Sequence, residues 1–255
     1  MLLAIDLGNT KIALGLYQGD RPGPRWRIAT DHERMPDEYG IMLIHLLEHA
    51  GIQPGNVKEI VMASVVPPLT GTLVQACELY LGRTPLVVDA GVKTGVAVRV
   101  EDPRQVGADR VVDTAAVHKL YGGPACIVDF GTATTFDAIS ASGEYLGGAI
   151  APGIGIAAEA LFKSAAKLPK VDISRPPSAI GKNTVHSLQS GLLFGYVSLV
   201  EGMVARFAQE LGPGMKVIGT GWLVELIARE CKAIGIVAPW LTLDGLKFIY
   251  DLNRK

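Results

Sequence analysis

Two stretches of the sequence place a carboxylate, a glycine and amide or hydroxyl side chains directly after an apolar run. They are DLGNTKIALG at residues 6–15 and IVDFGTATTFDAI at residues 127–139. Glycine lets a phosphate approach the backbone closely, and nearby N–H groups, with Asn9 and Thr10, can donate to phosphate oxygens. Asp6 cannot favour a bare phosphate, so its useful partner is a cation that bridges to one. Two facing turns of this kind could hold a metal triphosphate from both sides.

Each turn taken alone has a second interpretation, a tight hairpin whose Asp or Asn caps its own backbone. The matched pair favours phosphate binding over two independent hairpins. Other nucleotide signatures fail in this sequence. The GKN of residues 181–183 has Pro176 where the Walker motif has its first glycine, and Asn183 follows Lys182 where Ser or Thr is required.

Strands and helices alternate around the two turns. The first half predicts β-β-β-α-β-α-β, with its first helix in DEYGIMLIHLLEHAG burying Ile41, Ile44 and Leu47. The second half predicts a helix in ADRVVDTAAVHKLYGG, then strands in ACIVDFGTATTFDAIS, EYLGGAIAPG and KVIGTGW. Helices are expected from Ile156, from about Thr184, in LVELIAREC and in LTLDGLKFIYDLNR, whereas SRPPSAIGKN is expected to be a loop. Interleaved strands and helices predict a mostly parallel sheet covered on both faces, and the repeated order predicts a duplicated α/β unit.

Composition narrows the classes of function. The chain has 255 residues, of which 49% are hydrophobic and 19% are charged, and this suits a globular protein with a sizeable core. A net charge of −1 with no basic tract argues against nucleic acid as a partner. We expect no signal peptide, no transmembrane helix and no membrane partner, and therefore a cytoplasmic location. The three separated cysteines are expected to be reduced thiols.

The histidines offer one metal-binding alternative. His45, Glu48 and His49 match the H-x-x-E-H pattern of a family of zinc peptidases. An exposed face of the helix is the favoured explanation, because nothing else in the sequence looks like a peptidase and no third ligand is evident, so we expect no zinc site. The other histidines are expected to be ordinary surface or core residues, although the last follows Thr184 closely enough to line a site; they are His32, His118 and His186.

Several motifs together resemble a known family. They are DLGNTKIALG, SVVP (64–67), DPRQVGADR (102–110), DFGTATTFD (129–137), GGAIAPG (147–153) and GKNTVHSLQSGLLFGY (181–196). In this order they look like type III pantothenate kinases, of the acetate kinase/sugar kinase/Hsp70/actin superfamily. GADR with two flanking phosphate turns is specific, whereas DxGNT alone indicates only the superfamily. The resemblance implies two actin-like (ribonuclease H-like) α/β domains, residues 1–115 and 116–255, with central mixed sheets and a cleft between them.

The resemblance also implies an activity. Members of the family transfer the γ-phosphoryl group of ATP to the primary hydroxyl of pantothenate, giving 4′-phosphopantothenate in the first step of coenzyme A synthesis. They are typically homodimers that require Mg²⁺ and a monovalent cation, K⁺ or NH₄⁺. The apolar stretch SLQSGLLFGYVSLVEGMVARF has more hydrophobic faces than one core needs, so we expect it to pack against its twin in a C₂ dimer.

The resemblance assigns roles to individual residues. Contacts to ATP fall on Asp6, Leu7, Gly8, Asn9, Thr10, Lys11, Ile12, Ala13 and Thr132, with Asp6 near Mg²⁺ and Asp129 as the ligand of the monovalent cation. Contacts to pantothenate fall on Gly107, Ala108, Asp109, Arg110 and, reaching across the dimer, Thr184. Asp109 would be the general base, since a carboxylate can accept the proton of an alcohol nucleophile. On pattern alone, Asp109 and Arg110 could simply begin a helix whose dipole favours Asp.

Two positions depart from the family pattern, and two alternative functions stay open. Val100 stands where relatives carry a tyrosine, and Trp222 replaces the second glycine of a Thr-Gly-Gly step. Another small-alcohol or carboxylate kinase of the superfamily is one alternative, and a non-catalytic nucleotide-binding regulator is the other. The presence of Asp6, Asp109 and Asp129 together argues against the regulator.

Overall fold

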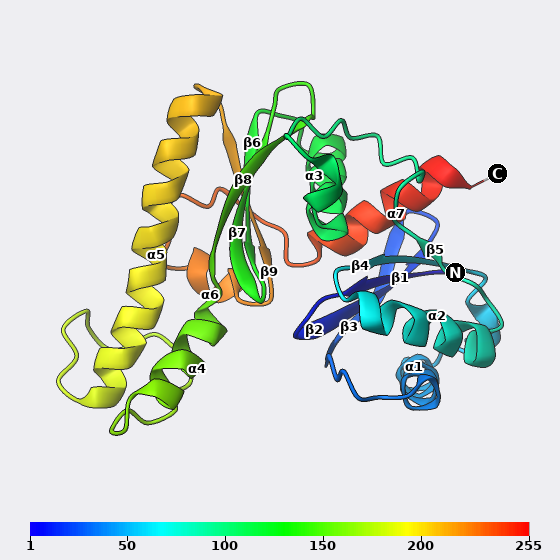
Figure 1. Cartoon of the computed structure of the whole chain (residues 1–255), viewed down its shortest axis with the longest axis horizontal. Coiled ribbons are helices and arrows are strands. Elements are labelled where there is room, and N and C mark those ends of the chain that lie inside the picture. Colours follow the sequence, from blue (N-terminus) through cyan, green and yellow to red (C-terminus); the bar gives the residue numbers. More distant parts are fainter. Residues whose placement is uncertain (255) are drawn as a thin grey trace. The chain divides into compact units, whose positions relative to one another are not determined.

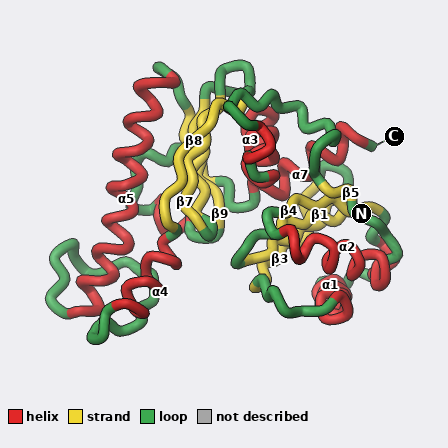
Figure 2. The backbone as a smooth tube through the Cα atoms, viewed as in Figure 1, coloured by secondary structure: helices red, strands yellow, loops and turns green. Residues whose placement is uncertain are grey.

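The computed structural model describes residues 1–254, which form two compact units (Figures 1 and 2). The first unit comprises residues 1–96, residues 102–116 and the chain from Thr242 onward; the second comprises residues 97–101 and 117–241. The chain passes from the first unit to the second after Ala116, next to the boundary expected near residue 115. The units nevertheless differ from the consecutive domains 1–115 and 116–255, because the closing helix returns to the first unit.

The sheet of the first unit has five strands in the order β3-β2-β1-β4-β5. Their bounds are β1 (Leu2–Leu7), β2 (Lys11–Gln18), β3 (Arg21–Ala29), β4 (Glu59–Ser64) and β5 (Leu86–Val87). The first three strands pair antiparallel, while β4 and β5 run parallel to β1. The connections between β1, β2 and β3 are too short for a parallel crossover, so the sheet is mixed rather than mostly parallel.

Helices α1 (Pro36–His49) and α2 (Pro67–Leu81) cover one face of this sheet, with a short turn of 3₁₀ helix (Pro54–Asn56) after α1 (Figure 1). The expected buried face of α1 was wrong at Ile41, which is 48% exposed. Gly40 explains the difference, because a Cβ atom there would lie 2.1 Å from the ring of Tyr80 in α2. This close approach fixes the side of α1 that faces α2 and leaves Ile41 outside.

The opposite face of the first sheet is covered by α7 (Leu241–Asn253), and α3 (Ala108–Leu120) packs against α7 at Gly245. Leu243 of α7 reaches the sheet where Gly15 has no side chain, since a Cβ there would lie 2.8 Å from its Cδ1. Arg25 and Asp244 form an ion pair of 2.6 Å beside this contact. These contacts are the physical reason that the closing helix belongs to the first unit.

The second unit repeats the same sheet in the order β8-β7-β6-β9-β10. Its strands are β6 (Ala125–Phe130), β7 (Ala133–Ile139), β8 (Tyr145–Pro152), β9 (Lys216–Gly221) and β10 (Ile236–Val237). Again three strands pair antiparallel, and the last two run parallel to the first. The two sheets have one topology, so the expected duplication of an α/β unit with a mixed sheet is confirmed.

Helices α4 (Ile154–Ser164), α5 (Thr184–Leu211) and α6 (Val224–Ala228) belong to the second unit. By length and apolar composition, α5 could also cross a bilayer. One of its faces, however, lies in the protein core; the buried side chains are Leu192, Leu193, Val197, Val200 and Val204. Core helices of globular proteins pass the same test of length and composition. Residues 174–183, before α5, contain neither helix nor strand, as expected.

Candidate functional site

The two aspartates of the phosphate-like turns occupy the same place in the two sheets. Asp6 is the last residue but one of β1, and Asp129 is the last but one of β6. The two strands also share one pattern of burial along their length. Gly8 N donates to the carbonyl of Lys11 at 3.1 Å, whereas Gly131 N donates to that of Ala133 at 3.0 Å. The turns are therefore related by the duplication, with the second turn one residue tighter.

Asp6 lies in a row of small and basic side chains on one face of the first sheet. In register with it stand Ala63 on β4 and Ala13 on β2, and Ala13 is in turn paired with Arg27 on β3. Lys11, two residues before Ala13, shares this face. Burial lowers the pKa of Lys11, and the neighbouring charge of Arg27 lowers it further. Two basic side chains and small neighbours around a carboxylate suit an anion accompanied by a cation.

The carbonyl groups of the first turn are held by the segment that follows β3. The hydroxyl of Thr30 donates to Gly8 O at 2.6 Å, and Thr30 N donates to Thr10 O at 3.0 Å. The ring Nε2 of His32 lies 3.3 Å from Asn9 O, within hydrogen-bonding distance. The side chains of Asn9 and Thr10 remain exposed at the tip. Sequence reasoning missed Thr30 and treated His32 as ordinary, because a side-chain bond to a distant backbone group has no local pattern.

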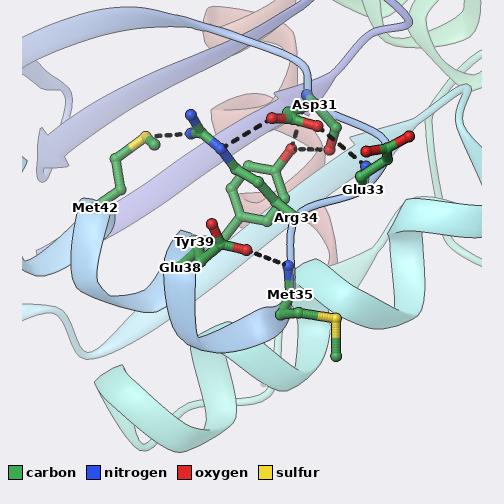
Figure 3. A network of polar contacts seen from close by, with 7 residues as sticks. All are labelled: Asp31, Glu33, Arg34, Met35, Glu38, Tyr39 and Met42. Atoms are coloured by element: carbon green, nitrogen blue, oxygen red, sulfur yellow. Dashed lines mark hydrogen bonds and ion pairs between the residues drawn. The ribbon is translucent and has the colours of Figure 1, made fainter.

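A polar network anchors this segment on α1 (Figure 3). The hydroxyl of Tyr39 donates to Asp31 O at 2.8 Å and accepts from Asp31 N at 3.1 Å. Arg34 pairs with the carboxylate of Asp31 at 3.3 Å and lies over the ring of Tyr39. At the start of α1, Glu38 accepts a hydrogen bond of 2.9 Å from Met35 N. Because Tyr39 is buried, the network ties the support of the turn to the core.

Asp109 lies in the first turn of α3, at the edge of the first sheet where β1 ends. Val65, which follows β4, donates its N–H to Leu7 O at 3.1 Å. A Cβ atom on Gly107 would lie 3.4 Å from Cγ1 of Val65 and 2.5 Å from Oδ1 of Asp109. The contacts from Leu7 through Val65 and Gly107 therefore bring Asp109 to the same edge as Asp6. The absence of a side chain at position 107 leaves room for the carboxylate.

The environment of Asp109 suits a proton acceptor. Burial raises its pKa above the ordinary value, although a 2.8 Å hydrogen bond from Arg110 N and the charge of Arg110 act in the opposite direction. A carboxylate with a raised pKa binds a proton more readily. The position of Asp109 in the first turn of α3 also fulfils the simpler expectation that it begins a helix, and the two roles are compatible. Arg110 as a whole is half-buried, and Nη2 of its guanidinium is buried.

Asp129 has a different environment from Asp6. Its partners in register are Thr135 on β7 and Thr220 on β9, so the carboxylate lies between two threonines. Gly221, with φ at +91°, closes over it, because a Cβ atom there would lie 2.4 Å from Oδ1 of Asp129. Gly131 approaches the other carboxylate oxygen in the same way. A carboxylate with hydroxyl oxygens on either side suits a cation better than an anion.

The remaining expected site residues belong to the second unit. Thr132 lies in the tight turn after β6, where Gly153 packs against its backbone: a Cβ at 153 would lie 2.1 Å from Thr132 O. Thr184 is exposed and begins α5, and the preceding Asn183 caps this helix by accepting from His186 N at 2.9 Å. The ring Nδ1 of His186 also lies 3.2 Å from Nδ2 of Asn183, so this side chain stands beside the start of α5.

The two departures from the family pattern are also in the second unit. Val100 packs near Gly147, whose φ is +114°, because a Cβ at position 147 would lie 3.7 Å from Cγ1 of Val100. Arg99, beside it, pairs with Glu144 at 2.7 Å and holds this segment in place. Trp222 follows Gly221 directly after β9 and is 36% exposed.

Two other features lie apart from these residues. A pocket of about 290 Å³ lies at the opposite end of β1, where Lys247 already forms ion pairs with both Asp20 and Asp251. His45 and His49 are exposed on α1, and residues 1–254 contain no group of three or more metal-binding side chains. The exposed-face interpretation of the H-x-x-E-H pattern accordingly fits the structure.

Comparison with known proteins identifies the family. Residues 2–206 match the family described as type III pantothenate kinase. A type III pantothenate kinase of Moorella thermoacetica is 53% identical over 99% of this chain and 100% of its own length. That of Roseiflexus castenholzii is 51% identical over the full length of both chains.

Among solved structures, similarity extends to more distant proteins of the same fold. A putative Baf family transcriptional activator from Campylobacter jejuni has a TM-score of 0.60 at 19% identity, covering 98% of both chains. A putative 2-dehydro-3-deoxygalactonokinase from Sinorhizobium meliloti has a TM-score of 0.58 at 13% identity, covering 99% of this chain and 97% of its own. These similarities establish the actin-like fold. Together with the match over residues 2–206 and relatives about half identical along their whole length, they lead to one conclusion: the chain belongs to the type III pantothenate kinase family.

Proposed function

We propose that this protein phosphorylates pantothenate with ATP to give 4′-phosphopantothenate, the first step of coenzyme A biosynthesis. The observation that carries the proposal is the position of Asp109. In a chain of this kinase family, a carboxylate of raised pKa is held at the same sheet edge as the turn that begins at Asp6. A phosphate-binding turn and a proton acceptor are the two parts that transfer to an alcohol requires.

The phosphates of ATP would lie against the first turn. The residues assigned to them are Asp6 through Ala13, with Thr132 of the second turn as a further contact. The contacts of Thr30 and His32 to the turn's carbonyl groups support this assignment, because they keep acceptor oxygens on one side. Lys11 and Arg27 contribute positive charge on the face of Asp6. Positioning and neutralising charge are the main demands of phosphoryl transfer.

Asp6 would hold Mg²⁺, since carboxylate oxygens are among the preferred ligands of this ion. When bound, Mg²⁺ neutralises the negative charge on the phosphate oxygens. Ala13 and Ala63, in register with Asp6, leave space around the carboxylate for the ion and its water ligands.

Asp109 would accept the proton of the primary hydroxyl of pantothenate on a carboxylate oxygen as that hydroxyl attacks phosphorus. Arg110, next to it, would bind the carboxylate of pantothenate or the transferred phosphoryl group through its planar guanidinium. Gly107 and Ala108 would line the same site, and Thr184 would contact pantothenate from the partner subunit of a dimer. In this assignment one short segment supplies both the base and an anion-binding group.

We extend the proposal to the monovalent cation and to assembly. Asp129, between Thr135 and Thr220, would bind K⁺ or NH₄⁺, and this oxygen-rich setting supports it. The helix α5 would pair with its copy in a homodimer, because Val185 is exposed in its first turn and further apolar side chains, such as Leu199 and Phe194, are only half-buried along it. We place the enzyme in the cytoplasm, where ATP and pantothenate are available.

The proposal is tested by a product assay. Purified protein with MgATP and pantothenate should form 4′-phosphopantothenate, and omission of K⁺ and NH₄⁺ should reduce the rate. Sugars, glycerol and acetate serve as competing acceptors and should give no product. Transfer to one of these acceptors, but not to pantothenate, would make the protein another kinase of the superfamily. Nucleotide binding with no transfer to any acceptor would support the regulator instead.

A further inference from the structure

One glycine joins the closing helix α7 to the helix that carries Asp109. Gly245 lies within α7, and a Cβ atom there would lie 2.4 Å from the carbonyl oxygen of Val112 in α3. It would also lie 2.8 Å from Cγ1 and 3.1 Å from the carbonyl carbon of Val112. Two of these three atoms are backbone, so a side chain at 245 could be accommodated only if one of the helices moved. Both residues belong to the first unit.

Glycine within a helix needs a physical reason, because it lowers helix stability relative to alanine. In α2, Gly71 shows the alternative: it is exposed, and a Cβ atom there would meet nothing within 4 Å. Gly245 differs from Gly71 in having backbone directly against it. The closeness of α7 to α3 accordingly depends on this glycine.

The helix α7 is itself fixed on the first sheet. Leu243, 1% exposed, enters the space left by Gly15 on β2. The carboxylate of Asp244 accepts hydrogen bonds of 2.6 Å from both Tyr17 of β2 and Arg25 of β3. Gly245 comes directly after these two residues. On its two sides, α7 therefore contacts the sheet that carries Asp6 and the helix that carries Asp109.

The contact on α3 lies close to the proposed base. Val112 follows Asp109 by three residues, about one helical turn, and is fully buried. Thr114, also fully buried, donates its hydroxyl to Arg110 O at 2.8 Å, a bond within α3 that links the turn of Thr114 to the turn of Arg110. A shift of α3 at Val112 would therefore carry Asp109 and Arg110 with it.

We propose that Gly245 is a positioning residue, which sets the place of Asp109 by letting α7 seat α3 against the first sheet. The proposal rests on the proposed function, in which Asp109 is the general base. It assigns a role in the reaction to a residue of the closing helix, beyond residues 2–206 that match the family. A misplacement of reacting groups by about 1 Å can reduce a rate by about 100-fold.

The test compares Gly245→Ala with Gly71→Ala in the full-length protein. Gly245→Ala should lower kcat for pantothenate by roughly 10- to 100-fold. It should shift the acid limb of the pH profile and change the KM for ATP by less than about twofold. Hydrogen exchange should become faster in peptides covering residues 108–116. Gly71→Ala should leave kcat, the pH profile and this exchange unchanged, since its side chain meets nothing.

Other outcomes decide against the proposal. If Gly245→Ala lowers the melting temperature but leaves kcat, the pH profile and exchange in α3 at wild-type values below melting, the glycine only serves stability. If Gly245→Ala does not fold, Asp244→Asn replaces it in the same measurements. This substitution loosens α7 from Arg25 without changing the size of the side chain. Wild-type values of kcat, pH profile and exchange in Asp244→Asn would overturn the proposal. Failure of the proposed function and failure of the positioning role can be told apart. If the wild-type enzyme does not phosphorylate pantothenate, the proposed function is refuted. If the wild type turns over pantothenate, Asp109→Asn lowers kcat and Gly245→Ala has no effect on it, only the positioning role is refuted.

Discussion

Thr30 holds the carbonyl of Gly8 through its hydroxyl, across 2.6 Å, while its own N–H holds the carbonyl of Thr10 across 3.0 Å. One residue after β3 thus fixes the turn between β1 and β2 at two points. Carbonyl oxygens would repel phosphate, so directing two of them towards Thr30 prepares the turn for an anion before it binds.

Replacing Thr30 by valine should weaken ATP binding. The substitution Thr30→Val keeps the side-chain shape but removes the donor to Gly8 O, a hydrogen bond of about 1 kcal/mol. We expect the KM for ATP to rise about fivefold, with little change in the KM for pantothenate. Steady-state kinetics with each substrate varied in turn measure both values. Thr30→Ser keeps the hydroxyl and is the control, and equal KM values for ATP in all three proteins would show that the bond does not support the nucleotide.

Removing the charge of Asp109 should abolish most activity without harming the fold. Asp109→Asn should reduce kcat by about 10²–10⁴-fold, the usual contribution of a general base, while ATP binding, measured by calorimetry, is retained. Because burial raises the pKa of Asp109, its negative form destabilises the folded state at neutral pH. The variant should therefore melt no lower than the wild type at pH 7. Near-normal turnover would remove Asp109 from the mechanism.

The same pKa shift makes a prediction about pH. The stability that Asp109 contributes is present while it is protonated in both states, below its unfolded pKa, and is lost as the pH rises through the raised folded pKa. Activity runs the other way, since the base must be ionised. We expect kcat to fall with decreasing pH along a limb whose apparent pKa lies above the ordinary Asp value. A profile without this limb at pH values where the protein remains folded would contradict the assignment.

Adding a methyl group at Gly107 should disturb Asp109 selectively. In Gly107→Ala the new Cβ atom would lie 2.5 Å from Oδ1 of Asp109, so the carboxylate must move. We expect kcat to fall at least about tenfold, with ATP affinity unchanged. Gly55→Ala, in the same unit, is the matched control, because its Cβ meets nothing within 4 Å. Comparable kinetics in the two variants would mean that the carboxylate position is not set by Gly107.

Replacing either of two buried threonines by valine should change the stability of the protein, in opposite directions. Thr134 and Thr114 are both fully buried. The hydroxyl of Thr114 donates to Arg110 O at 2.8 Å, whereas that of Thr134 has no hydrogen-bond partner within residues 1–254. Thr134→Val should raise the free energy of unfolding by about 1 kcal/mol, and Thr114→Val should lower it by a similar amount. Urea unfolding measures both, and a loss of stability in Thr134→Val would indicate that its hydroxyl is satisfied.

The order of strands and helices could be predicted because local patterns determine it. Apolar runs broken by glycine turns give β1, β2, β6 and β7, and helical spacing gives α1 and α5. The place of α7 could not be predicted, since it depends on Gly15, Arg25 and Asp244, which are far apart in the sequence and unremarkable in type. The buried face of α1 was misjudged for the same reason, as it depends on Tyr80 of another helix.

The site could be predicted where function imposes residue types in a short stretch. Asp6 and Asp129 could be paired from sequence because both follow a strand, and the structure gives them equivalent places in duplicated sheets. Thr30 could not be found, because a threonine after a strand is common and only the folded hairpin brings it to Gly8. Support for a site is usually of this kind, made of contacts between segments that carry no signature.

Asp6 and Asp129 occupy equivalent places in the two sheets but have different neighbours, so we expect them to bind different cations. Asp6 stands in register with Ala13 and Ala63, whereas Asp129 stands between Thr135 and Thr220. The open setting suits Mg²⁺ with its water ligands, and the hydroxyl-lined setting suits a weakly hydrated monovalent ion.

Asp129→Asn should accordingly raise the K⁺ concentration for half-maximal activity at least about tenfold, through loss of a close charge, while the Mg²⁺ requirement changes little. Asp6→Asn should raise the Mg²⁺ concentration for half-maximal activity, while the K⁺ requirement changes little. Titration of each ion against initial rate distinguishes the two variants. If both substitutions raised the requirement for Mg²⁺ alone, the second turn would belong to the metal nucleotide and not to a separate monovalent ion.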